Sequence, residues 1–265
     1  MSVTIALAGN PNCGKTTMFN ALTGANQYVG NWPGVTVEKK EGKLKNQKDV
    51  TVTDLPGIYS LSPYTLEEVV SRDYLLKEKP DVIIDLVDAT NIERNLYLAT
   101  QLLEIGIPVV IALNMVDLLK KNNIHINVKG LSSALGCPIV ETSALKGTGL
   151  KEVVDEAIKC ANQHRVPSKQ MEFPKAVEKA VNEIEGFVPA NIAEENKRWY
   201  AVKLLERDSK VKEGLNLPAS AQSRIEEIAS GLEKAEDDDT ESIVTDGRYQ
   251  YIQKVVSANV KRSGN

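Results

Sequence analysis

The sequence has few of the residues that build metal centres and disulfide frameworks. Its 265 residues include only three cysteines (Cys13, Cys137, Cys160) and two histidines (His125, His164), with no C-x-x-C spacing. An odd, sparse set of cysteines is typical of reduced thiols in a cytosolic compartment, and histidines this far apart favour surface positions over metal ligation. We therefore predict no disulfide framework and no preassembled transition-metal site.

Long apolar runs and a surplus of positive charge are also missing. No run approaches the roughly 18 apolar residues that span a bilayer, and the N-terminus lacks the basic and apolar regions of a signal peptide. The net charge of −4 argues against a nucleic-acid-binding surface. The composition, 42% hydrophobic and 26% charged, is typical of a soluble globular protein, and the length suits two domains. We expect a soluble cytosolic piece without a nucleic-acid partner.

What the sequence does contain is an ordered series of short motifs. Residues 9–16 (GNPNCGKT) fit G-x-x-x-x-G-K-[ST], the pattern of a loop whose backbone N–H groups cradle phosphates. The others follow in the order Thr36 in a Gly/Trp/Pro loop, Asp54-Leu55-Pro56-Gly57, Asn114-Met115-Val116-Asp117 and Ser143-Ala144. Together they predict a guanine-nucleotide site with magnesium ligands, a γ-phosphate sensor and a base reader.

The first motif supplies the phosphate chemistry. Lys15 is placed to reach the β- and γ-phosphates, and Thr16 offers a hydroxyl to Mg²⁺. Gly9 and Gly14 leave room for the backbone to wrap the phosphates. Their neighbours Asn10, Pro11, Asn12, Cys13 and Thr17 complete the predicted loop. Cys13 is interpreted as a small apolar filler rather than an acidified thiol, because bound phosphate opposes a thiolate there.

The second and third motifs are predicted to sense the γ-phosphate. Asp54 can hold Mg²⁺ through water, and the N–H of Gly57 can turn toward the γ-phosphate. Thr36 is the candidate for a second Mg²⁺ hydroxyl. It also fits a β-branched residue that opens a strand, since residues 35–38 (VTVE) are strand-like, and both roles are compatible.

The last two motifs are predicted to read the base. The ionised Asp117 carboxylate only accepts hydrogen bonds, and guanine offers N1–H and an exocyclic amine side by side whereas adenine does not. Asn114 can brace this loop and touch the base, and Met115 covers it. Ser143 and Ala144 complete the set, with the N–H of Ala144 as a donor to guanine O6.

Strand and helix patterns alternate through the first part of the chain. Apolar runs at residues 3–8, 50–54, 82–87, 108–113 and 139–142 predict strands, and each chemical motif follows one of them. This order is typical of a doubly wound, mostly parallel sheet, which binds ligands at the carboxyl ends of its strands. Asp85 interrupts one buried strand without an evident reason.

The alternation of strand and helix patterns ends after residue 162. We predict a G domain over residues 1–162, a polar linker with two prolines over 163–174, and a helical domain over 175–265 that contains no strand pattern. Pro189 and Pro218 separate its helical stripes. The acidic run 236–239 is interpreted as a solvated turn before the last helix.

At this point the residues resemble a known family. The segments 29–38 (VGNWPGVTVE), 54–61 (DLPGIYSL), 91–98 (NIERNLYL) and 113–117 (LNMVD), with the Asn-Pro-Asn loop, resemble the cytosolic N-terminal region of FeoB, the bacterial ferrous-iron transporter. The resemblance covers the G domain and is weaker in the helical part. It implies a Ras-like P-loop GTPase sheet followed by a small all-α domain that is described as guanine-nucleotide-dissociation-inhibitor-like.

The resemblance further implies nucleotide-responsive switches at about residues 25–38 and 57–68, and a membrane permease as the continuation of the same polypeptide. The chain would then lie at the cytoplasmic side of the bacterial inner membrane, coupled to Fe²⁺ uptake. Small cytosolic partners of the uptake system and homo-oligomerisation are further expectations.

Ile58 replaces the glutamine that orients water in Ras-like proteins. In similar potassium-activated GTPases the asparagine at the phosphate-loop position of Asn12 holds K⁺, and the carbonyls of Gly30 and Trp32 would complete the site here. The alternative is that Asn12 caps the loop through contacts with its own backbone. We therefore expect slow, Mg²⁺-dependent, K⁺-activated hydrolysis, with Asn12, Lys15, Thr36 and Gly57 as the catalytic set.

Two other classes of function stay open at this stage. A GTPase of ribosome assembly or tRNA modification shares the Asn-Pro-Asn loop but normally carries a basic RNA-binding appendage, which the acidic, aromatic-poor tail lacks. A nucleotide-binding module that rarely turns over is compatible with Ile58.

Overall fold

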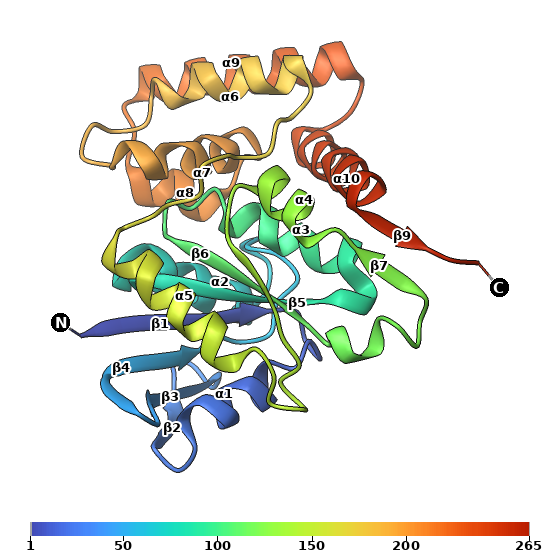
Figure 1. Cartoon of the computed structure of the whole chain (residues 1–265). Coiled ribbons are helices and arrows are strands. Elements are labelled where there is room, and N and C mark those ends of the chain that lie inside the picture. The colour runs from blue at the N-terminus through green and yellow to red at the C-terminus, as the bar shows by residue number, and fades with distance from the viewer. Residues whose placement is uncertain (1, 265) are drawn as a thin grey trace.

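The computed structural model describes residues 2–264 and is built around a seven-stranded, mostly parallel sheet (Figure 1). The strand order is β2-β3-β4-β1-β5-β6-β8, in which β2 and β3 run antiparallel to their neighbours and the other pairs are parallel. The strands are β1 (Val3–Gly9), β2 (Gln27–Asn31), β3 (Glu38–Leu44), β4 (Gln47–Asp54), β5 (Val82–Asp88), β6 (Val109–Asn114) and β8 (Ile139–Glu141).

Helices cover both faces of this sheet, as its buried strands require. On one face α1 (Lys15–Thr23) and α5 (Leu150–Asn162) pack through residues such as Phe19 and Val153 against Ile5 and Ile84. The remaining elements of this half are α2 (Leu66–Asp73), its π-helical continuation η1 (Tyr74–Glu78), α3 (Ile92–Leu102), α4 (Val128–Leu135) and the short turns η2 (Ala89–Asn91) and η3 (Val116–Leu118).

The second half is helical and packs on the face of the sheet that α3 covers. It contains α6 (Lys175–Glu185), α7 (Glu194–Leu205), α8 (Ser209–Leu215), α9 (Ala219–Glu236) and α10 (Thr240–Asn259). One continuous buried cluster includes Ile83 of the sheet, Leu98 of α3, Trp199 of α7 and Val244 of α10. The two halves therefore share a hydrophobic core, and among residues 2–264 no helix is long and apolar enough to cross a bilayer.

A buried ion pair joins the two halves within this core. The Arg248 guanidinium of α10 donates to both carboxylate oxygens of Glu104, each at 2.9 Å, and the two side chains are 2% and 0% exposed. Arg248 also contacts Met171 of the segment that connects the halves. This bidentate geometry satisfies both charges and fixes α10 against the G domain.

The structure corrects the expectation that the second half contains no strand. β9 (Val260–Arg262) follows α10 and pairs antiparallel with β7 (Ile124–Ile126) of the first half, beside which it lies in Figure 1. A strand of three residues is too short to show the alternation of apolar and polar residues from which strands are predicted. The acidic run does form the expected turn: Asp239 caps α10 by accepting from the N–H of Ser242.

Candidate nucleotide-binding site

The predicted motifs meet at one edge of the sheet. Parallel register places Leu7 of β1 beside Asp54 of β4, and Asp88 of β5 beside Asn114 of β6. The loops that leave these strand ends carry the phosphate-binding, magnesium and base-reading motifs. Because carboxyl ends of parallel strands share an edge, motifs distant in sequence become neighbours.

The phosphate loop leaves β1 and enters α1 through two left-handed residues. Asn12 has φ +66° and Gly14 has φ +92°. A side chain at Gly14 would collide with the Asn114 amide, and a Cβ at Gly9 would lie 2.6 Å from Cys13 Sγ and 3.0 Å from the Leu86 carbonyl. Only glycine allows both close approaches, so the loop geometry explains this part of the motif.

Lys15 and Asp54 are directly paired. The Lys15 ammonium contacts the Asp54 carboxylate and donates to the carbonyl of Leu55 at 2.6 Å. Asp54 is buried, which raises the pKa of its carboxyl, and the Lys15 charge opposes that shift. Bound nucleotide and Mg²⁺ would separate this ion pair. A phosphate would attract the Lys15 ammonium, and Mg²⁺, which prefers carboxylate or water oxygens, would attract the Asp54 carboxylate.

Asn114 braces the phosphate loop against the base-reading loop. Its amide nitrogen donates to the Cys13 carbonyl at 2.9 Å, and its amide oxygen accepts from the Ala144 N–H and the Thr142 hydroxyl, both at 3.0 Å. Asn114 is 2% exposed, so these bonds are well shielded from water. The N–H of Ala144, expected to serve guanine O6, is thus already engaged by Asn114 in this structure.

Thr142 is a functional residue that sequence reasoning missed. Its hydroxyl completes the set of donors around the Asn114 amide oxygen. The only signal in the sequence is its place directly before Ser143, because a strand that delivers one motif residue also orients the residue before it.

The residues predicted to read the base follow β6 and β8. Met115 adopts a left-handed conformation, φ +66°, at the start of η3, and Asp117 follows within that turn. The Asp117 side chain is half-buried. Ser143 is buried and forms a bridge with Thr148, which shapes the adjoining loop.

The segment predicted as the first switch is folded as a β-hairpin and its turn rather than a loop. Gly30 of β2 lies opposite Lys39 of β3, and Trp32 is 6% exposed. The Trp32 carbonyl accepts the N–H of Val35 at 3.2 Å, while Thr36 is exposed. The predicted metal ligands Thr36, Gly30 and Trp32 therefore belong to one hairpin and its turn.

The second switch begins against the phosphate loop. A Cβ at Gly57 would come within 3.2 Å of the Pro11 backbone, and the N–H of Ile58 donates to the Gly9 carbonyl at 3.1 Å. The Ile58 side chain is buried at 4% exposure within the hydrophobic core. Its position agrees with the inference that it cannot orient an attacking water.

Asn12 and Cys13 differ in accessibility. The Asn12 side chain is exposed and makes no hydrogen bond with residues 2–264, so it does not cap the phosphate loop. Cys13 is 1% exposed, and burial raises the pKa of its thiol to about 12. Cys13 is therefore a neutral apolar filler, as interpreted from sequence.

Fold and site together define a P-loop GTPase of the Ras-like class that carries a helical domain. A family model described as "Ferrous iron transport protein B" matches residues 3–157, and one described as "FeoB cytosolic helical domain" matches residues 173–261. The chain belongs to the FeoB family.

Individual relatives agree with this assignment. The chain is 40% identical over 263 residues to the Fe(2+) transporters FeoB of Shigella flexneri and of Escherichia coli strain K12, covering 96% of this chain and 33% of each relative. It therefore spans about a third of the length of these curated relatives.

Solved structures match over the whole fold. A GDP-bound mutant of the S. thermophilus FeoB G-domain matches with a TM-score of 0.94 and 47% identity, over 98% of this chain and 100% of that one. NFeoB from S. thermophilus bound to GDP.AlF4- and K+ matches with a TM-score of 0.88 and 48% identity, over 96% and 99%.

Proposed function

We propose that this chain is the GTP-binding and GTP-hydrolysing region of a bacterial ferrous-iron transporter. The observation that carries the proposal is the position of Asn114, whose amide ties the Cys13 carbonyl of the phosphate loop to the Ala144 N–H of the base-reading loop. This brace holds the phosphate and base subsites at a fixed separation, as a selective guanine-nucleotide site requires. No comparable observation favours the ribosome-assembly or tRNA-modification alternative.

The residues divide into three tasks. Lys15 and the loop backbone hold the β- and γ-phosphates, while Asp117 selects guanine through its acceptor-only carboxylate. Thr16, Asp54 and Thr36 would hold Mg²⁺, whose charge offsets that of the phosphates. Gly57 would sense the γ-phosphate through its N–H.

Hydrolysis would depend on a second, monovalent cation. Ile58 follows Gly57, and its aliphatic side chain is buried. Asn12 projects an exposed amide at that loop. With the carbonyls of Gly30 and Trp32 it would hold K⁺ against charge developing on the β–γ bridge. NFeoB from S. thermophilus, 48% identical, has been solved with GDP.AlF4- and K+. We expect slow turnover that needs Mg²⁺.

The larger protein would connect this switch to a membrane. Its relatives are about three times longer, so the proposal includes a permease region in the same polypeptide, with this part at the cytoplasmic side of the inner membrane. Small cytosolic partners and self-association are further parts of the proposal. The domain limits proposed are 1–162, 163–174 and 175–265, because α5 ends at Asn162 and α6 begins at Lys175.

Two assays test this function in the intact transporter. GTP turnover and Fe²⁺ uptake should both be lost in Lys15→Ala and retained in Lys151→Ala, which removes an exposed lysine of α5. If Lys15→Ala abolished GTP turnover without any effect on Fe²⁺ uptake, the chain would be a GTPase that is not coupled to iron uptake. Equal turnover in the two variants would remove Lys15 from the catalytic set.

A further inference from the structure

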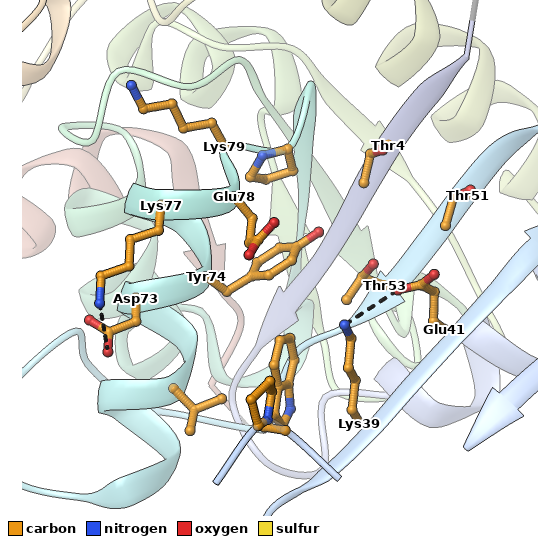
Figure 2. Close-up of a pocket in the computed structure, with 14 residues that line it drawn as sticks. Thr4, Lys39, Glu41, Thr51, Thr53, Asp73, Tyr74, Lys77, Glu78 and Lys79 are labelled. Carbon is orange, nitrogen blue, oxygen red and sulfur yellow. Dashed lines mark ion pairs between the residues drawn. The ribbon is translucent and has the colours of Figure 1, made fainter. Parts of the chain in front are cut away.

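A cavity of about 550 Å³ lies away from the phosphate loop and the base-reading loop, and Trp32 and Pro33 of the Thr36 loop form part of its lining (Figure 2). Three elements enclose it: the turn after β2 at Trp32 and Pro33, one face of strands β1, β3 and β4, and the helical segment from Val70 through η1. Cavities of this size accommodate small organic ligands. A π-helix such as η1 is rare and is found frequently at functional sites.

The sheet wall of the cavity presents hydroxyl groups. Thr4 of β1 lies opposite Thr51 of β4 in the parallel register, and Thr53 is the next residue of β4 on the same face. Figure 2 shows these threonines on the strand side, facing Tyr74 and Glu78 of η1. Hydroxyls both donate and accept, so this wall suits a ligand edge that carries both kinds of group.

The end of the cavity is aromatic. The Trp32 and Tyr74 rings meet edge to face with centroids 5.3 Å apart, and the Lys39 ammonium lies 4.8 Å from the centroid of the Trp32 ring. Trp32 and Tyr74 are 6% and 7% exposed. Among residues 2–264 nothing accepts a hydrogen bond from the buried Trp32 Nε1–H, so the ring is held by packing and by the Lys39 ammonium, and its position is sensitive to what fills the adjoining space.

The charges around the cavity cancel. Lys39 pairs with Glu41 at 3.6 Å and Lys77 with Asp73 at 3.8 Å, as the dashed lines in Figure 2 mark. The remaining charged lining residues, Glu78 and Lys79, have opposite signs. A charged ligand would have to disrupt one of these pairs, whereas an uncharged ligand would not.

We propose that this cavity is a regulatory site for a small, uncharged, planar heteroaromatic molecule. Its ring would pack at the Trp32–Tyr74 end and its polar edge would face the threonine hydroxyls. Trp32 lies four residues before Thr36, so a ligand that fixes Trp32 resists the movement that brings Thr36 to Mg²⁺. This regulatory consequence rests on the proposed function, whereas occupancy of the cavity does not.

The test uses the full chain labelled with 5-fluorotryptophan, which reports Trp32 and Trp199 alone because the sequence contains two tryptophans. The probe is quinazolin-4-one, an uncharged bicyclic amide with a donor and an acceptor. Titration should shift the ¹⁹F resonance of Trp32 and leave that of Trp199, which the variant Trp199→Phe identifies. Benzoate and benzamidine, the charged counterparts, should bind about tenfold more weakly.

Two variants that fill the cavity from opposite walls, Thr51→Phe and Val70→Phe, should abolish the Trp32 shift. Gln47→Phe, an exposed position on the same strand β4, should retain it. A Trp32 shift that survives both filling variants, or no shift at all, would overturn the site. Stronger binding of a charged probe would overturn the ligand class.

Hydrolysis measured separately distinguishes the two proposals. GTP turnover without the probe tests the proposed function. Saturating quinazolin-4-one should slow that turnover by about five-fold in the unmutated protein and leave Thr51→Phe unaffected. Occupancy with unchanged turnover would contradict the regulatory role while the cavity site stands.

Discussion

The guanidinium of Arg72 donates to the carboxylate of Asp208 across 2.8 Å, and each side chain is 2% exposed. Arg72 belongs to α2, directly after the second switch, and Asp208 caps α8 of the helical domain by accepting from the N–H of Val211. Trp199 lies beneath the guanidinium at 5.1 Å. The Arg72 charge of α2 is therefore paired with a carboxylate on the other half of the protein.

Replacing one partner of this pair should destabilise the protein strongly. Arg72→Met leaves the Asp208 carboxylate buried and uncompensated, and we expect a loss of about 3–5 kcal/mol in the free energy of unfolding. The double variant Arg72→Met/Asp208→Asn removes both charges but keeps a capping oxygen, so it should recover at least half of that loss. Urea titration at neutral pH measures the free energy of unfolding of the unmutated protein, the single variant and the double variant.

The exposed pair Arg262–Glu93 provides the control for this comparison. Its nitrogen and oxygen are 2.9 Å apart, close to the 2.8 Å of the buried pair, but the side chains are 46% and 38% exposed. Arg262→Met should therefore cost less than about 1 kcal/mol. A similar loss for Arg72→Met and Arg262→Met would show that burial of the Arg72 pair has no energetic consequence.

A second, solvent-facing contact should affect nucleotide release more than stability. The Tyr64 hydroxyl in the second switch donates to the Glu241 carboxylate of α10, at 2.7 and 2.8 Å. Tyr64→Phe and Glu241→Gln should each accelerate GDP dissociation by up to about five-fold, because the helical domain then restrains the switch less. Stopped-flow release of a fluorescent GDP measures the effect.

Tyr249→Phe is the matched control, since Tyr249 is an exposed tyrosine of α10 that stacks on Tyr97. Its GDP dissociation rate should equal that of the unmutated protein. If Tyr64→Phe also leaves the rate unchanged, the contact between Tyr64 and Glu241 does not restrain the switch.

Much of the site could be predicted because its chemistry depends on local geometry. Gly14 and Lys15 belong to a phosphate-binding motif that is contained in eight consecutive residues. The strands that position this loop are long and apolar, so they too can be predicted from sequence. The brace by Asn114 was partly predictable, but its bond to the Ala144 N–H depends on the spacing of two strand ends. Such spacing is set by packing and leaves no periodic signal.

The elements that were not predicted from sequence are short or polar. β2 was not predicted, and only the start of β3 was, from the strand-like residues 35–38. Both strands consist largely of charged and polar residues, and they pair through the hairpin turn at Trp32. β7 and β9 are three-residue strands that meet only because α10 delivers Val260 beside Ile126. Tertiary contacts overrode local propensity at each of these places.

Asp85 should make the stability of the protein fall as the pH rises. Its side chain lies in the buried strand β5, the Oδ2 atom has no partner among residues 2–264, and burial raises its pKa well above the ordinary range. Between the unfolded pKa near 3.9 and the higher folded pKa, only the folded state keeps the proton. The carboxyl therefore destabilises the fold increasingly across that window.

The comparison with Asp85→Asn isolates this effect, because other titrating groups are common to both proteins. We expect the advantage of the variant in the free energy of unfolding to grow by about 1.4 kcal/mol for each pH unit above 4 until the folded pKa is reached. Denaturant titrations from pH 4.5 upward would test it. A difference independent of pH would show that Asp85 has an ordinary pKa in the fold.

Guanine selectivity should depend on Asp117. Asp117→Asn exchanges an acceptor-only group for a mixed donor and acceptor, so GTP binding should weaken by about 100-fold or more and xanthosine triphosphate binding should improve. Competition against a fluorescent GDP analogue measures both nucleotides. Asp155→Asn, an exposed aspartate of α5, should behave as the unmutated protein. Undiminished GTP affinity in Asp117→Asn would contradict the role of Asp117.

Potassium should accelerate hydrolysis through Asn12. Ras-like turnover without a helper is slow, on the order of 10⁻⁴ s⁻¹, and added positive charge at the transition state increases it greatly. Ile58 supplies no water-orienting group, whereas the Asn12 amide is exposed on the phosphate loop. Hydrolysis should be faster in KCl than in NaCl at equal ionic strength. Asn12→Ala should abolish that difference with little change in GDP affinity, because the phosphate contacts of the loop come from its backbone and Lys15.

Asn122→Ala is the control for this experiment. Asn122 is an exposed asparagine whose amide donates to the Leu118 carbonyl, away from the phosphate loop, so its variant should keep the preference for potassium. The first-switch hairpin adds a structural condition: the Trp32 carbonyl accepts the Val35 N–H here, so its use as a potassium ligand requires the turn to reorient when GTP binds. Potassium should therefore stimulate hydrolysis without tightening GDP binding. Equal rates in the two salts for the unmutated protein would remove potassium from the mechanism and leave the GTPase assignment intact.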